Sequence, residues 1–259
     1  MNNEQSVTLL RRNKRKQVEV LNGLGFASVT AATRASLFPD YIKWARGLLD
    51  ARVAIVRISD GAKFYLTIQE WESLSNANKA LFVKQGVRVR ANGLDFVLSA
   101  IALGTYAWGS NKDVTTLTNY GQTGATNIYT ESLDALTLTQ RINTYYGTAT
   151  ANNVTGAPAA KAALEYKAFT QATDGVADDA NWCLPLPIHC LAMFRHIEAI
   201  NDVLRRAWSS DNIITTSALW TCLECSANNA WEFLMSYGGV MDTTKVTAIT
   251  VRPITLLNT

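Results

Sequence analysis

Histidine is nearly absent from this sequence, and its scarcity restricts the chemistry open to the chain. The 259 residues include two histidines, His189 and His196. Both fall within one expected helix, where neither would stand beside an activated nucleophile as a general acid–base catalyst must. We therefore expect a binding protein and not an enzyme.

Cysteine is also scarce, and the four that occur, at positions 183, 190, 222 and 225, are too few to form a disulfide framework in a chain of this length. Cys222 and Cys225 have the CxxC spacing of a zinc half-site or a redox pair. Six residues separate Cys183 from Cys190, more than the roughly two to four of a zinc half-site. We favour buried thiols at 183 and 190 and chance occupants of a variable loop at 222 and 225, and expect no metal or other cofactor.

Long apolar runs are missing as well. No segment reaches the roughly 18 unbroken apolar residues of a membrane-spanning helix, and residues 1–20 hold no apolar run of signal-peptide length. We expect a chain made and folded in a cytoplasm, without a signal peptide and without membrane insertion.

Charge is sparse, at 17% of residues with a net charge of +3. It gathers near the start, in Arg11, Arg12, Lys14, Arg15 and Lys16. No aromatic residue interleaves with this cluster and no second basic face follows it, so we expect an acidic protein partner or a solvated arm, and no nucleic acid.

The first third of the chain alternates strand and turn signals. Residues 51–58 and 63–68, joined by Asp60–Gly61, predict a β-hairpin. Thr67 and Glu70 have capping-box spacing and open a short helical pair divided near Ser75–Asn76. Residues 87–89 and 96–98 predict two more strands around a turn at Asn92–Gly93. We divide the chain into a basic arm (1–30), a small mixed α/β attachment region (31–86) and a larger domain (87–259).

The larger domain begins with a Thr-, Asn- and Gly-rich stretch over 104–156, for which we expect long loops and one helix near 133–145. Pro158 starts an alanine-rich segment that predicts a helix to about residue 172. Apolar residues then recur at spacings of three and four over 188–207, which indicates an amphipathic helix. Strands follow, with Trp231, Phe233 and Met235 alternating inward on one of them.

The C-terminal part contains an ordered set of residues: Trp182-Cys183-Leu184-Pro185, the helix over 188–207, Trp220 with Glu224, Ala230-Trp231, Gly238, Lys245 and Val251-Arg252-Pro253-Ile254. This set resembles the C-type-lectin-like fold in its phage and bacterial form. This form is related to formylglycine-generating-enzyme domains and to the variable proteins of diversity-generating retroelements. Three positions depart from the pattern: His189 replaces an acidic residue, and Cys222 and Leu223 replace small hydroxyl residues.

The resemblance implies an α+β fold with short antiparallel strands, two helices and long loops. An oxidase of the formylglycine-generating type shares this fold, but fold alone does not carry activity. Animal lectins of this fold bind calcium through carboxylates, and Asp174, Asp178 and Asp179 would be candidates. Without a recognisable sugar-binding motif we interpret these three as a solvated turn.

The resemblance also separates a constant scaffold from a changeable face. We expect Arg252 and Glu224 to form a buried ion pair, and Leu223, Leu234, Tyr237 and Met241 to form an exposed apolar patch. The expected scaffold is Trp182, Trp220, Glu224, Trp231, Gly238 and Arg252. The expected ligand-binding face, which a retroelement would make hypervariable, is Leu219, Cys222, Leu223, Cys225, Ala227, Glu232, Leu234, Ser236, Tyr237 and Met241.

These features favour a phage or prophage virion surface protein, of the fibre or receptor-binding kind, that attaches to a host-surface protein or glycan. Its N-terminal region would contact other virion proteins, and we expect a homo-oligomer, with a trimer as one form. The alternative is a purely structural head or tail decoration or fibre protein that packs against neighbouring subunits. A bacterial surface domain of the same fold is a third hypothesis.

Overall fold

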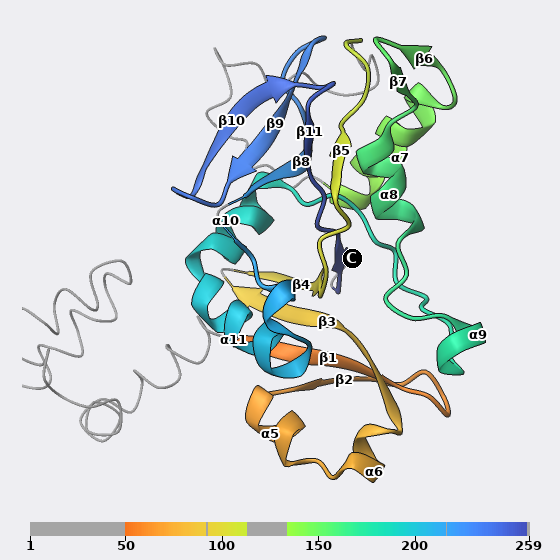
Figure 1. Cartoon of the computed structure of the whole chain (residues 1–259), viewed down its shortest axis with the longest axis vertical. Coiled ribbons are helices and arrows are strands. Elements are labelled where there is room, and N and C mark those ends of the chain that lie inside the picture. The colour runs from red at the N-terminus through yellow and green to blue at the C-terminus, as the bar shows by residue number, and fades with distance from the viewer. Residues whose placement is uncertain (1–49, 92, 113–133, 216, 258–259) are drawn as a thin grey trace, which may run out of the picture. The chain divides into compact units, whose positions relative to one another are not determined.

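Two five-stranded sheets organise the residues that the structure describes (Figure 1). The structure is a computed structural model, and it describes residues 50–91, 93–112, 134–215 and 217–257. Sheet A has the order β12-β4-β3-β1-β2 and is antiparallel throughout. Its strands are β1 (Asp50–Arg57), β2 (Lys63–Leu66), β3 (Phe82–Ala91), β4 (Leu94–Ser99) and β12 (Ile254–Leu256).

Sheet B has the order β10-β9-β8-β11-β5, with one parallel pair, β8 and β11. A short hairpin of β6 (Thr150–Ala151) and β7 (Val154–Thr155) stands apart from both sheets. The described chain is therefore mixed α+β with mainly antiparallel sheets, in agreement with the predicted class. The strands of sheet B are β5 (Thr105–Ala107), β8 (Ala218–Glu224), β9 (Asn229–Leu234), β10 (Gly239–Thr244) and β11 (Ala248–Thr250).

Local signals placed the first elements correctly. β1 and β2 form the predicted hairpin, whose turn is held by the Arg57 guanidinium donating to Asp60 at 2.9 Å. The capping box is present, because the Glu70 N–H donates to Thr67 Oγ1 at 3.2 Å and the Thr67 N–H donates to Glu70 Oε2 at 2.7 Å. It opens α5 (Ile68–Ser73), and α6 (Asn76–Lys79) follows.

The predicted domain boundary at residues 86/87 falls inside β3. Gly86 pairs with Ala54 of β1 on one side and with Ser99 of β4 on the other. Residues 50–86 consequently share sheet A with the rest of a single unit, Asp50–Thr259, and the boundary has to be corrected. Pairing between distant strands decides this, and local patterns do not report it. The predicted arm over 1–30 and the first part of the 31–86 region lie outside the described residues.

The described residues in the middle of the unit form three helices: α7 (Ala135–Tyr146), α8 (Pro158–Glu165) and α9 (Gln171–Asp174). The helix expected to reach residue 172 ends at Glu165, because Tyr166 is extended and its ring packs edge-on against Trp182 at a centroid distance of 4.9 Å. The contact between Tyr166 and Trp182 thus ends the helix at Glu165. Thr170 then caps α9 by accepting from the Thr173 N–H.

The amphipathic helix expected over 188–207 is two helices, α10 (Pro187–Arg195) and α11 (Ile197–Ala207). His196 separates them with φ −118° and ψ 19°. In Figure 1, α11 lies along β1 and β3 of sheet A, while α10 lies beneath sheet B. The break allows α11 to follow sheet A, while α10 packs between sheet A and sheet B. Two of the contacts of α10 are the Phe194 ring on Phe233 of β9 and the His189 ring on Phe96 of β4.

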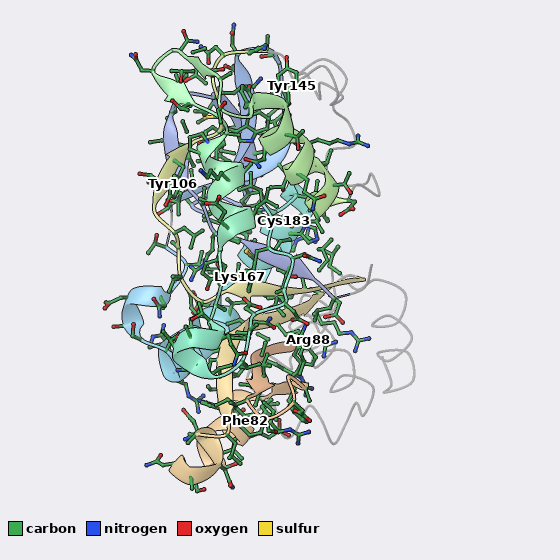
Figure 2. The ribbon with its side chains drawn as sticks, turned by 90° about the vertical axis from the view of Figure 1, so that its right-hand side faces the viewer. Phe82, Arg88, Tyr106, Tyr145, Lys167 and Cys183 are labelled. Carbon is green, nitrogen blue, oxygen red and sulfur yellow. The ribbon has the colours of Figure 1, made fainter. Side chains whose placement is uncertain are left out.

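The segment from Trp182 to Pro185 joins the two sheets, and Figure 2 labels Cys183 within it. The Cys183 N–H donates to the Ile254 carbonyl of sheet A at 2.8 Å. The Cys222 N–H of sheet B donates to the Pro185 carbonyl at 3.0 Å. The Trp182 side chain is buried, so this motif is part of the core.

Candidate functional site

Five of the six residues predicted as scaffold are buried, and the sixth, Gly238, is half-buried. Glu224 at the end of β8 forms an ion pair with Lys245, and both side chains are 0% exposed. Lys245 Nζ also donates to the carbonyls of Lys112 and Ala227, at 2.8 and 2.9 Å, and lies 5.2 Å from the centre of the Trp108 ring. One ammonium group therefore connects three segments of the chain.

The predicted ion pair between Arg252 and Glu224 is wrong, because Glu224 pairs with Lys245. The buried Arg252 guanidinium donates to the backbone carbonyls of Ser99 at 3.3 Å, Ala100 at 2.6 Å and Asn212. Burial lowers the pKa of Arg252 to about 10. Arg252 thus anchors the end of β4 to the segment after α11.

Half of the predicted ligand-binding face is buried. Because β8 lies between β9 and β11, both of its neighbouring edges are occupied, and α10 adds cover on one side. Positions that the sequence suggested to be exposed loop residues therefore lie in a central strand or in the turn that follows it. The buried positions are Leu219, Cys222, Leu223, Cys225 and Glu232.

The remaining predicted positions lie at the surface. Ala227 and Ser236 are exposed, and Leu234 is half-buried. Tyr237 is 61% exposed and Met241 is 44% exposed, which is high for such large apolar side chains. The structure therefore reduces the predicted face to the edge of sheet B formed by β10 and the turn before it.

Cross-strand pairing arranges this edge in two rows. Met241 of β10 is opposite Glu232 of β9, which is opposite Trp220 of β8. Gly239 is opposite Leu234, and Leu234 is opposite Ala218. Directly opposed residues in an antiparallel pair project to the same face. Trp220, Glu232, Leu234 and Met241 therefore share one face of sheet B, and the Phe233 ring on α10 marks the other.

Two consecutive glycines place the Tyr237 ring on that same face. A β-carbon at Gly239 would lie 2.6 Å from Tyr237 Cε2, so the ring rests on the bare α-carbon of Gly239. Because Gly239 is opposite Leu234, the ring covers the Leu234 side of the sheet. A β-carbon at Gly238 would lie 2.3 Å from the Phe194 ring on the opposite side. We call Leu234, Tyr237 and Met241 the outer apolar face.

Glu232 stands among these side chains, and its residue surface is 2% exposed. The Thr243 hydroxyl hydrogen-bonds the carboxylate, while Oε2 has no hydrogen-bond partner among the described residues. Burial raises the pKa of Glu232, and the Thr243 hydrogen bond opposes that rise. The prediction that Glu232 points away from the Phe233 side is confirmed by the strand register, whereas its predicted exposure is wrong.

The four cysteines are free thiols with little exposure. Burial raises the pKa of Cys183, Cys190, Cys222 and Cys225 above the ordinary value. A raised pKa keeps a thiol protonated and weakens it as a nucleophile or metal ligand. Within the described part of the chain, no group of three or more His, Cys, Asp or Glu side chains is arranged to hold a metal ion.

The three aspartates before Trp182 do not converge, and the expected solvated turn is wrong for Asp178. Its buried carboxylate accepts four hydrogen bonds, from Gln85 Nε2 at 3.0 Å, Trp182 Nε1 at 2.8 Å and the N–H groups of Ala168 and Ala180. Asp174 accepts from Thr170 at the start of α9, and Asp179 pairs with Lys63 at 2.8 Å. Each carboxylate thus has its own protein partners.

Sequence reasoning missed Thr243 and Gly239, which position Glu232 and Tyr237. Gly238-Gly239 was a signal that could have revealed a close approach at this turn, because glycine occurs where a side chain would collide. The alternation of apolar and polar residues over 239–244 is too weak to show which residues face Glu232.

Among the described helices, none has the length and apolar character needed to cross a membrane.

Comparisons with known proteins leave the family open. No protein-family model and no curated protein matches the sequence. The fold is similar to the crystal structure of a fimbrial protein from Bacteroides ovatus ATCC 8483, with a TM-score of 0.47 and 13% sequence identity. The match covers 80% of this chain and 48% of that chain, so this chain corresponds to about half of the fimbrial protein.

Proposed function

We propose that the chain is an attachment protein whose C-type-lectin-like part binds a host-surface ligand through the outer apolar face. The observation that carries the proposal is the joint exposure of Tyr237 and Met241 beside Leu234 on one face of sheet B. Contiguous exposed apolar side chains on a soluble unit commonly mark an interaction site.

The residue types suit recognition. Tyr237 offers a large rigid ring with a hydroxyl group, and few rotamers are lost when such a side chain is immobilised by a ligand. Met241 offers a flexible thioether that adapts to different partner surfaces. Both side chains stand on a sheet whose other face is packed on α10, so the contact surface has a rigid support.

The lectin-like part of the proposal is supported by the roles of the residues that carry the resemblance. The Trp182–Pro185 segment joins the two sheets, Glu224 and Lys245 tie three segments together, and Arg252 anchors the end of β4. These positions are constrained by packing, as a constant scaffold requires.

We place this attachment protein on a phage or prophage virion, where a retroelement would vary the contact residues. The structure narrows the positions at which variation is tolerated. Ala227, Ser236, Tyr237 and Met241 are exposed, and changes there would leave the core intact. Changes at Cys222 or Leu223 would disturb buried packing.

An oxidase function is less well supported. Cysteine-dependent catalysis needs a thiolate, and burial keeps all four thiols protonated. Cys222, the first residue of the CxxC pair, is 0% exposed and lies within a central strand.

A purely structural virion protein is the second candidate, and the same exposed side chains favour it. Tyr237 and Met241 would be covered if neighbouring copies packed through β10, which is an edge strand of sheet B among the described strands. Edge strands readily pair with other chains.

The test is binding of the fluorescently labelled full chain to intact cells from a panel of bacterial strains, measured by flow cytometry. The double variant Tyr237→Ser/Met241→Ser should bind at least about tenfold more weakly than the unmodified chain. Leu81→Ser is the matched control, because Leu81 is 55% exposed but lies just before β3. Equal binding of the double variant, or binding to no strain, would contradict the proposal.

Light scattering on the same proteins separates the two candidates. If the unmodified chain is oligomeric and the double variant is monomeric, the face is an interface between copies. If the mass is unchanged while cell binding falls, the face contacts the host.

A further inference from the structure

We propose that Glu232 makes the outer apolar face a subsite for a basic side chain, lysine or arginine, presented by a protein ligand. This inference rests on the proposed function, because it specifies what the ligand-binding face recognises. It selects a protein partner over a neutral glycan and places the contact at a single carboxylate oxygen.

The first observation is that the Glu232 carboxylate has a hydrogen-bond partner at only one of its two oxygens. Thr243 hydrogen-bonds it from the neighbouring strand β10, whereas Oε2 is buried and finds no donor within the described part of the chain. Buried side-chain oxygens in folded proteins are nearly always hydrogen-bonded, and an exception calls for a missing partner. A donor group from a ligand would complete the site.

The second observation is the sign of the charge. Glu232 forms no ion pair with any described residue, and its neighbours along the row are Trp220 and Met241. Lys245, the lysine that follows β10 in the chain, is paired with Glu224. The subsite therefore offers a negatively charged hydrogen-bond acceptor that no described lysine or arginine pairs with. Such an acceptor suits an ammonium or guanidinium group.

The third observation is the apolar surround. Lysine and arginine carry methylene stems that pack on apolar surfaces while the charged head seeks a polar partner. Leu234, two residues along β9 from Glu232, and Met241, opposite Glu232 on β10, share its face of the sheet and offer such a surface. The Tyr237 ring, resting over Gly239, adds an aromatic face that attracts cations. A polyhydroxylated sugar would bury hydroxyl groups against Leu234 and Met241 without partners.

Access to the oxygen depends on Met241. It is directly opposite Glu232 and 44% exposed, and its unbranched side chain can move at small cost. A basic side chain that enters between Met241 and Tyr237 would reach Oε2 from the solvent side. The burial that raises the pKa of Glu232 in the free protein would be offset by the incoming positive charge.

The test uses two small probes that share a four-carbon side chain, N-acetyl-lysine methylamide and N-acetyl-norleucine methylamide, of which only the lysine probe ends in an ammonium group. The full chain is labelled with carbon-13 at its methionine methyl groups, and the Met241 signal is assigned with Met241→Leu. The lysine probe at millimolar concentration should shift the Met241 signal, and the norleucine probe should shift it far less. Met235 is 3% exposed and serves as an internal reference that should not move.

Glu232→Gln keeps the shape of the side chain and removes its charge. In this variant the lysine probe should bind about tenfold more weakly, as expected for loss of a hydrogen bond to a charged group. A thermal melt of Glu232→Gln close to that of the unmodified chain shows that the weaker binding is not unfolding.

Equal responses to both probes, an unchanged response in Glu232→Gln, or no response of Met241 to the lysine probe would each overturn the inference. None of these results bears on cell binding by the outer apolar face. Failure of the cell-binding assay would remove the proposed function itself, so the two failures are distinguishable.

Discussion

Lys245 and Glu224 form an ion pair from which solvent is excluded on both sides, and this pair connects the end of β8 with the segments around Lys112 and Ala227. Two charges removed from water are stable only as a hydrogen-bonded pair. The Trp108 ring beneath the ammonium and the carbonyls around it complete that environment.

Removing one member of this pair should destabilise the protein strongly. Lys245→Met leaves the Glu224 carboxylate buried without its cation, and we expect a loss of about 3–5 kcal/mol in the free energy of unfolding. The double variant Lys245→Met/Glu224→Leu removes both charges and should recover much of that loss. Urea denaturation of the two variants measures the difference, and equal losses in both would contradict a buried pair.

Gly238 and Gly239 should respond differently to the same substitution. Gly238→Ala forces a β-carbon against the Phe194 ring at a residue with φ +75°, and should cost about 1–3 kcal/mol. Gly239→Ala meets only the exposed Tyr237 ring, which can swing away, and should change stability by less than about 1 kcal/mol. It should weaken cell binding, since it moves Tyr237. Denaturation and flow cytometry on both variants check this, and equal stability losses would contradict the opposite placement of the two glycines.

Acid should weaken the fold partly through His189. Burial lowers the pKa of His189 to about 4 from an ordinary value of 6.5. As the pH falls, His189 takes up a proton near pH 6.5 in the unfolded chain but only near pH 4 in the folded chain. Protonation between these values therefore favours the unfolded chain. The contribution of neutral His189 to stability is fully present above pH 6.5 and is lost as the pH falls toward 4. The difference corresponds to about 3 kcal/mol at most.

His189→Asn provides the matched variant, because its side-chain oxygen can still accept the Leu186 N–H that His189 Nδ1 accepts at 3.2 Å. Stability measured between pH 4 and 7 should depend less steeply on pH in this variant. Burial also lowers the pKa of His196, which therefore contributes with the same sign in both proteins. Parallel profiles for the two proteins would show that His189 does not titrate as described.

Asp178 should matter far more than its neighbour Asp179. Asp178→Asn places an amide donor where the carboxylate accepts from Gln85, Trp182 and two backbone N–H groups, and should cost about 2–4 kcal/mol. Asp179→Asn removes a surface pair with Lys63 and should change stability very little. Thermal melts of the two variants measure the loss of stability at each position. Similar losses at both positions would contradict the buried role of Asp178.

Elements held by neighbours in the sequence were predictable. The Asp60–Gly61 turn, the Thr67–Glu70 capping box and the Gly93 turn form through contacts within a few residues, so the sequence contains all the information they need. The inward alternation of Trp231, Phe233 and Met235 was predictable for the same reason, because strand geometry sets it.

The exposed edge of sheet B was less predictable, because the exposure of a strand depends on what lies next to it. Leu219, Cys222 and Leu223 resemble exposed loop residues in the sequence, yet they are buried because β9, β11 and α10 surround β8. The partner of Glu224 was mistaken for Arg252, since several basic residues precede and follow it and only the folded chain selects Lys245.

The sequence by itself determined the local turns, caps and strand faces, and it predicted the exposure of Tyr237 and Met241 in the C-terminal third of the chain. The tertiary structure alone decided that one sheet spans the predicted domain boundary, that α10 and α11 separate at His196, and that Tyr237 lies beside Leu234 across Gly239. Contacts within a turn are fixed by nearest neighbours along the chain. Burial, ion-pair choice and sheet order depend on residues far apart in sequence, whose approach no local pattern encodes.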